Sequence, residues 1–156
     1  MAFRAGPVGI QLGEQTMTDR KTVLVLCTGN SCRSQMAEAI LRHELGGQVR
    51  ALSAGTRPQP KVAEDAIAAL KLAHLPTEGL YSKDISAVMN EPIDLVVTVC
   101  DNAKQTCPIF PRPVPRIHLP FHDPHGEPLE SFVRVRNEIH VRLVPAVLEA
   151  LALERR

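Results

Sequence analysis

A short apolar run, TVLVL, leads directly into Cys27, and a loop of small polar residues follows it. The β-branched and leucine side chains predict a short buried strand over residues 22–26. From Ser34 to Leu45 the apolar side chains recur at helical spacing, and Gly46-Gly47 ends that pattern. A strand that turns tightly into a helix brings the unpaired amides at the start of the helix to the end of the strand. This unit indicates an α/β fold.

The same alternation continues to the end of the chain. Further strands are predicted over residues 49–54, 93–99 and 116–119, and helices over residues 61–74, 86–90 and 130–154, while residues 100–107 and the proline-rich residues 108–115 are expected to be loops. We therefore expect an α/β fold, a four-stranded parallel sheet flanked by helices on both faces. Ligands bind such sheets at the carboxyl ends of the strands. Two of the predicted strands end on cysteines, Cys27 and Cys100.

The spacing of Cys27 and Arg33, C-x5-R, indicates an anion-binding loop. The small residues between them can curl so that their amide N–H groups converge, and the helix N-terminus adds positive potential. Arg33 adds a planar fork suited to a tetrahedral oxyanion. The same field is expected to stabilise a thiolate at Cys27, helped by a hydrogen bond from Ser34, which would make Cys27 a nucleophile. A core thiol at a strand end is the alternative. The expected oxyanion-binding residues are Thr28, Gly29, Asn30, Ser31, Cys32, Arg33 and Ser34.

Length and composition exclude several other classes of function. The 156 residues suit one domain, and residues 1–20 show no clear period, so we expect a flexible N-terminal extension and a single catalytic domain over residues 21–156. A net charge of +1 and an aromatic share of 3% disfavour nucleic-acid binding. No stretch approaches the roughly 18 apolar residues of a membrane span, and the N-terminus lacks a secretory layout. We expect a cytoplasmic monomer.

The four cysteines limit the chemistry further. A reducing compartment argues against permanent disulfides. Zinc is disfavoured, because C-x4-C at residues 27–32 and C-x6-C at residues 100–107 fit the usual short ligand pairs poorly. Incidental thiols in a surface loop remain an alternative for Cys100 and Cys107.

The sequence of this loop resembles that of a known family. The strand–CTGNSCRS–helix unit is similar to the phosphate-binding loop of the low-molecular-weight protein tyrosine phosphatase fold, and CTGNSCRSQMAE resembles the thioredoxin-coupled arsenate reductases more closely. The likeness covers about residues 21–150 and includes SAGT at 53–56, DLVVTVCDNAKQTCPIFP at 94–111, HDP at 122–124 and FVRVRNEI at 132–139.

This resemblance implies an enzyme of arsenic detoxification and resistance, with catalytic roles for Cys27, Arg33, Cys100, Cys107 and Asp123. It implies that Cys27 forms a thiol–arsenate adduct and that Asp123 acts as the general acid. Cys100 would then attack Cys27, release arsenite and form a Cys27–Cys100 disulfide. Cys107 would resolve it to a redox-active Cys100–Cys107 disulfide that thioredoxin reduces. The segment 100–107 must move for this exchange.

The resemblance also implies which ligands bind. Arsenate is the expected substrate, with phosphate or sulfate as analogues, and no cofactor is required beyond electrons from thioredoxin. Some members hold a potassium ion at positions matched here by Asn30, Glu38, Ser53 and Asp84, which are otherwise polar scaffold residues. Cys32 matches a cysteine outside the relay and is expected to be structural.

Two other functions remain as alternatives. One is a low-molecular-weight phosphatase that hydrolyses phosphate monoesters, although His125 stands where such enzymes usually carry the tyrosine of Asp-Pro-Tyr. The other is a non-catalytic oxyanion or redox sensor. His122 stands where several relatives carry a second aspartate beside Asp123, and both histidines are expected to be exposed loop residues rather than a metal pair.

Overall fold

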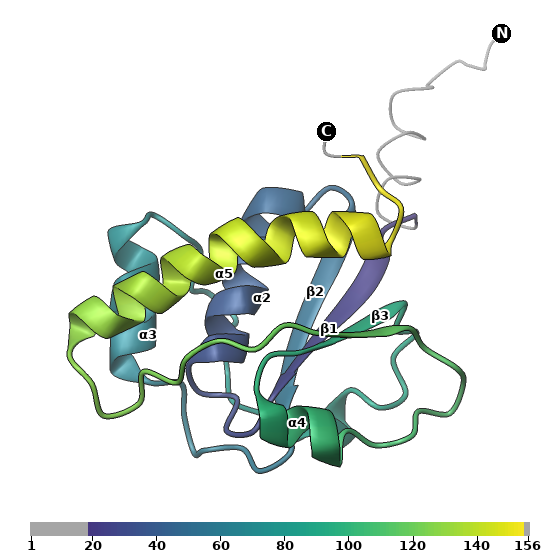
Figure 1. The fold of residues 1–156 in the computed structure, drawn as a ribbon, viewed down its shortest axis with the longest axis horizontal. Coiled ribbons are helices and arrows are strands. Elements are labelled where there is room, and N and C mark those ends of the chain that lie inside the picture. The colour runs from purple at the N-terminus through teal and green to yellow at the C-terminus, as the bar shows by residue number, and fades with distance from the viewer. Residues whose placement is uncertain (1–18, 155–156) are drawn as a thin grey trace, which may run out of the picture.

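In a computed structural model the structure describes residues 19–154, so the expected N-terminal extension lies almost wholly outside the described residues. The elements, in chain order, are β1 (Lys21–Cys27), α2 (Arg33–Leu45), β2 (Val49–Gly55), α3 (Glu64–Leu72), the 3-10 turn η1 (Ile85–Ala87), β3 (Leu95–Thr98), α4 (Asp101–Thr106), β4 (Arg116–His118) and α5 (Leu129–Ala150). The four strands form one parallel sheet in the order β2-β1-β3-β4 (Figure 1). The predicted fold class is confirmed.

Three predicted segments differ from the structure. The helix expected over residues 86–90 is only the 3-10 turn η1, Ile85–Ala87. Residues 100–107 were expected to form a loop, but residues 101–106 form helix α4, because the Cys100 sulfur caps the helix by accepting a hydrogen bond from Ala103 N. Helix α3 begins at Glu64 rather than at residue 61. Ala63 has extended backbone angles, and its N–H donates to Ser31 O at 3.0 Å. The chain before α3 is therefore bound to the loop that follows β1.

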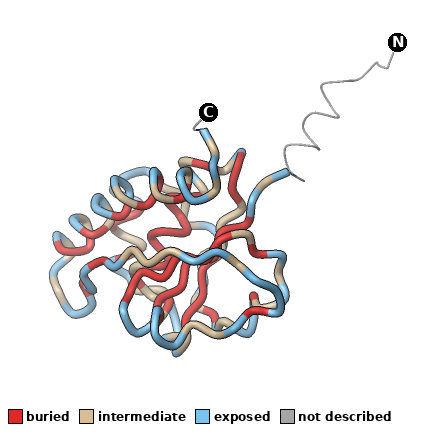
Figure 2. Tube along the Cα trace, turned by 45° about the vertical axis from the view of Figure 1, so that its right-hand side comes forward, coloured by how far each residue is buried: buried red, intermediate tan, exposed pale blue. Residues whose placement is uncertain are grey.

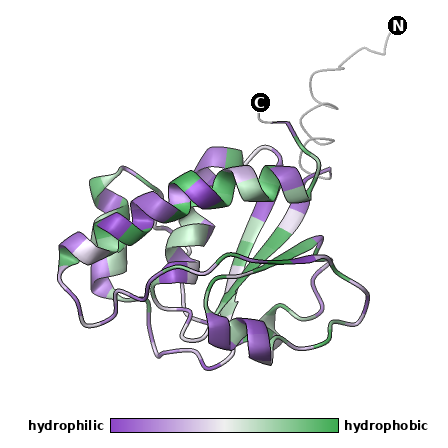
Figure 3. Cartoon of the chain, in the orientation of Figure 1, coloured by the Kyte–Doolittle hydropathy of each residue, from purple (hydrophilic) through white to green (hydrophobic). Residues whose placement is uncertain are grey.

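The core is built around β1, whose residues Thr22 to Cys27 are all buried. Side chains alternate between the two faces of a strand, so both faces of β1 are covered. Helix α2 packs on β1 and β2, helix α5 crosses α2 and α3, and helix α4 packs on β1 and β3 (Figure 1). Strands β1 and β3 are almost wholly buried (Figure 2) and strongly apolar (Figure 3). No helix among residues 19–154 is both long and apolar enough to cross a bilayer.

The strand order determines where the cysteines meet. Strands β1 and β3 are neighbours, with Leu26 opposite Thr98. Val99 N donates to Leu26 O at 2.9 Å, which extends this pairing past the end of β3. The next residue is Cys100, while β1 ends at Cys27. The two cysteines therefore lie side by side at the carboxyl edge of the sheet, where the strand order reverses.

Candidate active site

The loop between β1 and α2 is held from outside through its carbonyl groups. Six consecutive carbonyls accept hydrogen bonds from surrounding residues: Cys27 O from Thr56 N (3.2 Å), Thr28 O from Arg57 N (2.9 Å), Gly29 O from Gln59 N (2.8 Å), Asn30 O from Gln35 Nε2 (2.9 Å), Ser31 O from Ala63 N (3.0 Å) and Cys32 O from Met36 N (2.9 Å). In a trans peptide the N–H of the next residue points in the direction opposite to the carbonyl. The amides of residues 28–33 therefore face the inside of the loop. Within residues 19–154, those of residues 29–33 donate to no acceptor.

Two residues allow the loop to make this turn. Asn30 is fully buried and has a positive φ of 47°, a conformation that asparagine tolerates better than most residues. Gly55 lies against the loop so closely that a Cβ atom there would stand 2.6 Å from Thr28 O. Any larger residue at position 55 would push the loop out of shape.

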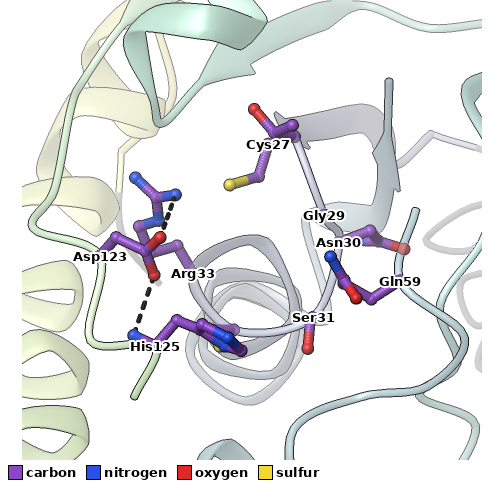
Figure 4. A pocket seen from close by; sticks show the side chains of 10 residues that line it. Cys27, Gly29, Asn30, Ser31, Arg33, Gln59, Asp123 and His125 are labelled. Carbon is purple, nitrogen blue, oxygen red and sulfur yellow. Dashed lines mark hydrogen bonds and ion pairs between the residues drawn. The ribbon is translucent and has the colours of Figure 1, made fainter. Parts of the chain in front are cut away.

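These amides and Arg33 line a pocket of about 170 Å³, together with Cys27, Gln59, Asp123 and His125 (Figure 4). The Cys27 sulfur points into it (Figure 4). Arg33 Nη1 donates to Phe121 O at 3.1 Å, and Nη2 lies 3.5 Å from Asp123 Oδ2. Arg33 Nε is buried and has no hydrogen-bond partner among the described residues. The pocket thus combines converging amides with a guanidinium, which suits a small tetrahedral oxyanion.

The pocket contains most of the predicted oxyanion-binding residues but not Ser34. Residues 28–33 line it, as expected. Ser34 is fully buried, and its Oγ accepts a hydrogen bond from Asn30 Nδ2 at 2.8 Å. No hydrogen bond from Ser34 to the Cys27 sulfur is present in the described structure. Ser34 therefore supports Asn30 rather than the nucleophile.

The sulfur atoms of Cys27 and Cys100 are within hydrogen-bonding contact. Both residues are almost fully buried, and all four cysteines carry free thiols. The Cys100 sulfur also shares a hydrogen bond with Thr28 Oγ1 (3.2 Å) and accepts one from Ala103 N (3.4 Å). Cys100 thus contacts polar groups of the loop and of α4.

The contact between the two thiols shifts their pKa values in opposite directions. The hydrogen bonds from Cys27, Thr28 and Ala103 lower the pKa of Cys100 to about 5, against the opposing effect of burial. The hydrogen bond to Cys100 and burial raise the pKa of Cys27, although Arg33 opposes them. The contact with Cys100 thus opposes the expected thiolate at Cys27, whereas the charge of Arg33 favours it.

The third cysteine of the predicted relay lies at the other end of α4. Cys107 is half-buried, and its Sγ donates to Pro108 O at 3.8 Å. Arg116 Nη2 donates to the same carbonyl at 2.8 Å. Burial raises the pKa of Cys107, and the nearby charge of Arg116 opposes that rise. The structure thus brings Cys100, but not Cys107, to Cys27.

Asp123 lies at the rim of the pocket, half exposed beside Arg33 (Figure 4). Its Oδ1 accepts a hydrogen bond from His125 N at 3.0 Å, which holds the turn around Pro124. His122 is turned to a different partner, with its Nε2 2.7 Å from Glu127 Oε2. Asp123 is therefore within reach of an oxyanion held by the loop.

Sequence reasoning missed two residues of this site. Gln59 lines the pocket because its N–H donates to Gly29 O. This position depends on the course of the chain after β2, so no local sequence pattern indicates it. His125 was expected to be an ordinary exposed loop residue. It is exposed, but it also lines the pocket. Its place directly after the Asp-Pro pair was the available signal.

The four residues matched to a potassium site do not all meet. Asn30, Ser53 and Glu38 are buried and connected by hydrogen bonds. Asp84 is exposed, and its carboxylate accepts a hydrogen bond from Ser86 N at 2.9 Å. In the described part of the chain no cluster of three or more His, Cys, Asp or Glu residues is arranged to hold a metal ion.

Known proteins show the same fold and a similar sequence. Residues 22–155 match the family described as low molecular weight phosphotyrosine protein phosphatase. Arsenate reductase 1 of Bacillus cereus is 42% identical over 127 residues, which cover 81% of this chain and 94% of that protein. A solved arsenate reductase in the phosphate binding state is 27% identical, with a TM-score of 0.68 and coverage of 83% of this chain and 98% of that one. The low molecular weight protein tyrosine phosphatase from T. tengcongensis is 25% identical, with a TM-score of 0.72 and coverage of 83% and 99%.

Proposed function

The chain belongs to the low molecular weight phosphotyrosine protein phosphatase family, and from this membership we propose that it is an arsenate reductase that draws its electrons from thioredoxin. The contact between the Cys27 and Cys100 sulfur atoms is the observation that carries the proposal. A phosphatase needs one sulfur nucleophile, since water releases the phosphoryl group, whereas two adjacent thiols can supply two electrons. The 42% identity to an arsenate reductase over most of both chains supports the same activity.

The first step is capture of arsenate by the loop. Its oxygens accept hydrogen bonds from the amides of residues 28–33 and from Arg33, as phosphate and sulfate would. The Cys27 sulfur then bonds to arsenic, and its proton passes along the existing hydrogen bond to Cys100. Asp123 protonates the departing oxygen, which leaves as water.

The second step transfers the electrons. The Cys100 sulfur attacks the Cys27 sulfur and gives its proton to an oxygen on arsenic. The sulfur–arsenic bond breaks, and its electron pair stays on arsenic, which is reduced from the +5 to the +3 state and leaves as arsenite. A Cys27–Cys100 disulfide remains.

The third step requires α4 to unwind. Cys100 and Cys107 stand at opposite ends of this helix. Seven residues at about 1.5 Å each separate them by about 10 Å, whereas a disulfide needs Cα atoms within about 7 Å. After unwinding, Cys107 attacks Cys100, its proton goes to the released Cys27, and thioredoxin reduces the Cys100–Cys107 disulfide. We place this reaction in the cytoplasm and assign it to a monomer of the domain formed by residues 21–156.

The alternative is hydrolysis of phosphate monoesters, which the family and the pocket both allow. Gln59 and His125 give the pocket a polar mouth, which suits an inorganic oxyanion better than an aromatic ester. A weak phosphatase activity is expected, because the loop distinguishes phosphate from arsenate poorly. It would require Cys27 but not Cys100.

Arsenate-dependent NADPH oxidation with thioredoxin and thioredoxin reductase tests the proposal. The wild type should turn over repeatedly. Cys27→Ser and Cys100→Ser should abolish the reaction, and Cys107→Ser should allow at most one turnover. Gln105→Ser, an exposed position on the same helix, is the matched control and should retain wild-type turnover.

Two results would count against this mechanism. Repeated turnover by Cys107→Ser with thioredoxin would show that the proposed relay is wrong and that another thiol donor serves. Hydrolysis of p-nitrophenyl phosphate by Cys100→Ser at the wild-type rate, without any arsenate reduction by the wild type, would favour the phosphatase.

A further inference from the structure

A buried polar cluster lies beneath the oxyanion loop, on the side away from the pocket. Figure 4 shows the Asn30 side chain directed away from the pocket. Four further polar side chains complete the cluster, each less than one-tenth exposed: Gln35, Glu38, Ser53 and Lys83. Only Asn30 belongs to the loop itself. The cluster thus connects the loop to α2, β2 and the segment before η1.

The hydrogen bonds of this cluster run in one direction. Lys83 N donates to Asn30 Oδ1 (2.9 Å), Asn30 Nδ2 donates to Ser53 Oγ (3.0 Å), and Ser53 Oγ donates to Glu38 Oε1 (2.6 Å). A serine has one hydroxyl proton, and here an acceptor-only carboxylate takes it, which leaves the serine lone pairs for Asn30. The Asn30 amide is thus connected to Glu38 through Ser53, while Ser34 Oγ accepts a second hydrogen bond from Asn30 Nδ2 at 2.8 Å.

The charge of Glu38 is balanced by the chain itself. Lys83 Nζ lies 3.8 Å from Glu38 Oε1, and the two side chains are 8% and 5% exposed. Arg42, which is partly exposed, pairs with the other carboxylate oxygen. Lys83 Nζ also donates to Tyr81 O (3.1 Å) and lies 4.2 Å from the centre of the Tyr81 ring. Burial lowers the pKa of Lys83, and the charge of Glu38 opposes that shift.

A potassium ion does not fit this arrangement. Its fourth implied ligand, Asp84, faces solvent and binds Ser86 N. An ion beside Glu38 would also meet the Lys83 ammonium at close range, and like charges repel strongly where little water screens them. Of the residues that the resemblance associates with an ion, Glu38 lies beside the Lys83 ammonium, and Asn30 Oδ1 accepts a hydrogen bond from the Lys83 backbone N–H.

We propose that the Lys83 ammonium serves as a built-in cation under the oxyanion loop, in place of a monovalent metal ion, and is a positioning residue that acts on the loop through Glu38, Ser53 and Asn30. The proposal rests on the oxyanion binding of the proposed function but not on the cysteine relay. Lys83 touches no reacting atom. Its effect is to fix the Asn30 side chain and with it the amides that bind the anion.

Phosphate binding measured by calorimetry tests this proposal without arsenate, thioredoxin or turnover. The probe is inorganic phosphate, titrated in potassium chloride and in choline chloride at equal ionic strength and pH. The wild type should give the same Kd in both salts. In choline chloride Lys83→Met should bind phosphate about tenfold more weakly, as expected for the loss of one charge-assisted contact. Potassium chloride should restore most of that loss, because the ion can take the position of the ammonium.

Matched variants separate positioning from folding. Lys71→Met removes an exposed lysine on α3 and should bind phosphate like the wild type in both salts. The double variant Glu38→Gln/Lys83→Met avoids an uncompensated buried charge and keeps the proposal testable if Lys83→Met does not fold. It should bind phosphate weakly in both salts, because no carboxylate remains to attract potassium.

Three results would overturn the proposal. The first is a wild-type Kd that is several-fold lower in potassium chloride, since an ion would then bind in addition to Lys83. The second is wild-type affinity in Lys83→Met. The third is a loss in Lys83→Met that potassium does not restore, which would assign Lys83 a packing role. If the wild type bound no phosphate at all, the oxyanion step of the proposed function would fail as well.

Discussion

A hydrogen bond between two sulfur atoms links the protonation of the two cysteines at this site. Cys27 faces the pocket, but its hydrogen bond to Cys100 and its burial raise its pKa, while the pKa of Cys100 falls to about 5. These shifts favour a thiol at Cys27 and a thiolate at Cys100. A sulfur that can accept the Cys27 proton is then already in place.

The pH dependence of alkylation tests this charge distribution. Protonation removes the Cys100 thiolate as pH falls through about 5, so wild-type Cys100 should react with iodoacetamide with a midpoint near pH 5. Cys27→Ala removes the largest lowering effect and should move the midpoint upward, towards the ordinary thiol range. Mass spectrometry of the labelled peptide measures the rate at each pH. Cys107→Ala is the control and should leave the midpoint in place.

At the scale of single residues, the sequence predicted the loop that holds Cys27 and Arg33 but not the hydrogen bonds around the two sulfur atoms. The C-x5-R spacing was sufficient to place Cys27 and Arg33 in one loop. The charge on each sulfur depends on donors that come from Thr28 and from the first turn of α4. Those donors meet Cys100 only when β1 and β3 pair, so no local pattern contains the information.

Helix α4 is the element that sequence reasoning read wrongly. DNAKQT has a single buried side chain, Ala103, so it lacks the apolar period that identifies longer helices. Its helical state depends on its ends. Cys100 caps the N-terminus, and Asp101 provides an acidic residue in the first turn, where it is favourable.

A side-chain bridge connects the start of α4 to the sheet. His118 at the end of β4 has Nε2 2.9 Å from Asp101 Oδ1, and its Nδ1 is 2.8 Å from Thr98 Oγ1 on β3. His118→Ala should speed hydrogen exchange of the amides of residues 101–106 about fivefold, which corresponds to about 1 kcal/mol for one hydrogen bond. Native-state exchange followed by mass spectrometry measures this.

The matched control for this bridge is His122→Ala. His122 pairs with Glu127 in another loop and should leave the exchange of residues 101–106 unchanged. Equal protection of α4 in His118→Ala and the wild type would show that the bridge does not stabilise the helix.

On the scale of the whole molecule, the alternation of strands and helices was enough to predict the parallel sheet. The predicted strands each appear within a few residues of their expected ends. The position of Gln59 in the pocket could not be predicted, because it depends on how the chain between β2 and α3 wraps around the loop. The spacing of apolar residues indicates which face of a helix or strand is buried, but it does not predict the path of the chain between elements.

Helix α5 should contribute strongly to the stability of this fold. Ile139 is fully buried on its inner face, whereas Val141 is 72% exposed on the same helix. Ile139→Ala should lower the free energy of unfolding by about 2–5 kcal/mol, the range for truncating a buried isoleucine. Val141→Ala should change it by less than about 0.5 kcal/mol. Urea denaturation of both variants measures the difference, and equal stability would contradict the assigned packing of α5.

The six outward-facing carbonyls have a consequence for how such proteins diverge. The groups that bind these carbonyls do not include Cys100 or Cys107. Binding of the oxyanion and its reduction therefore depend on different residues. Replacement of Cys100 and Cys107 can remove the reducing ability while the anion-binding loop keeps its shape. Hydrolases and reductases can therefore share one ancestral fold.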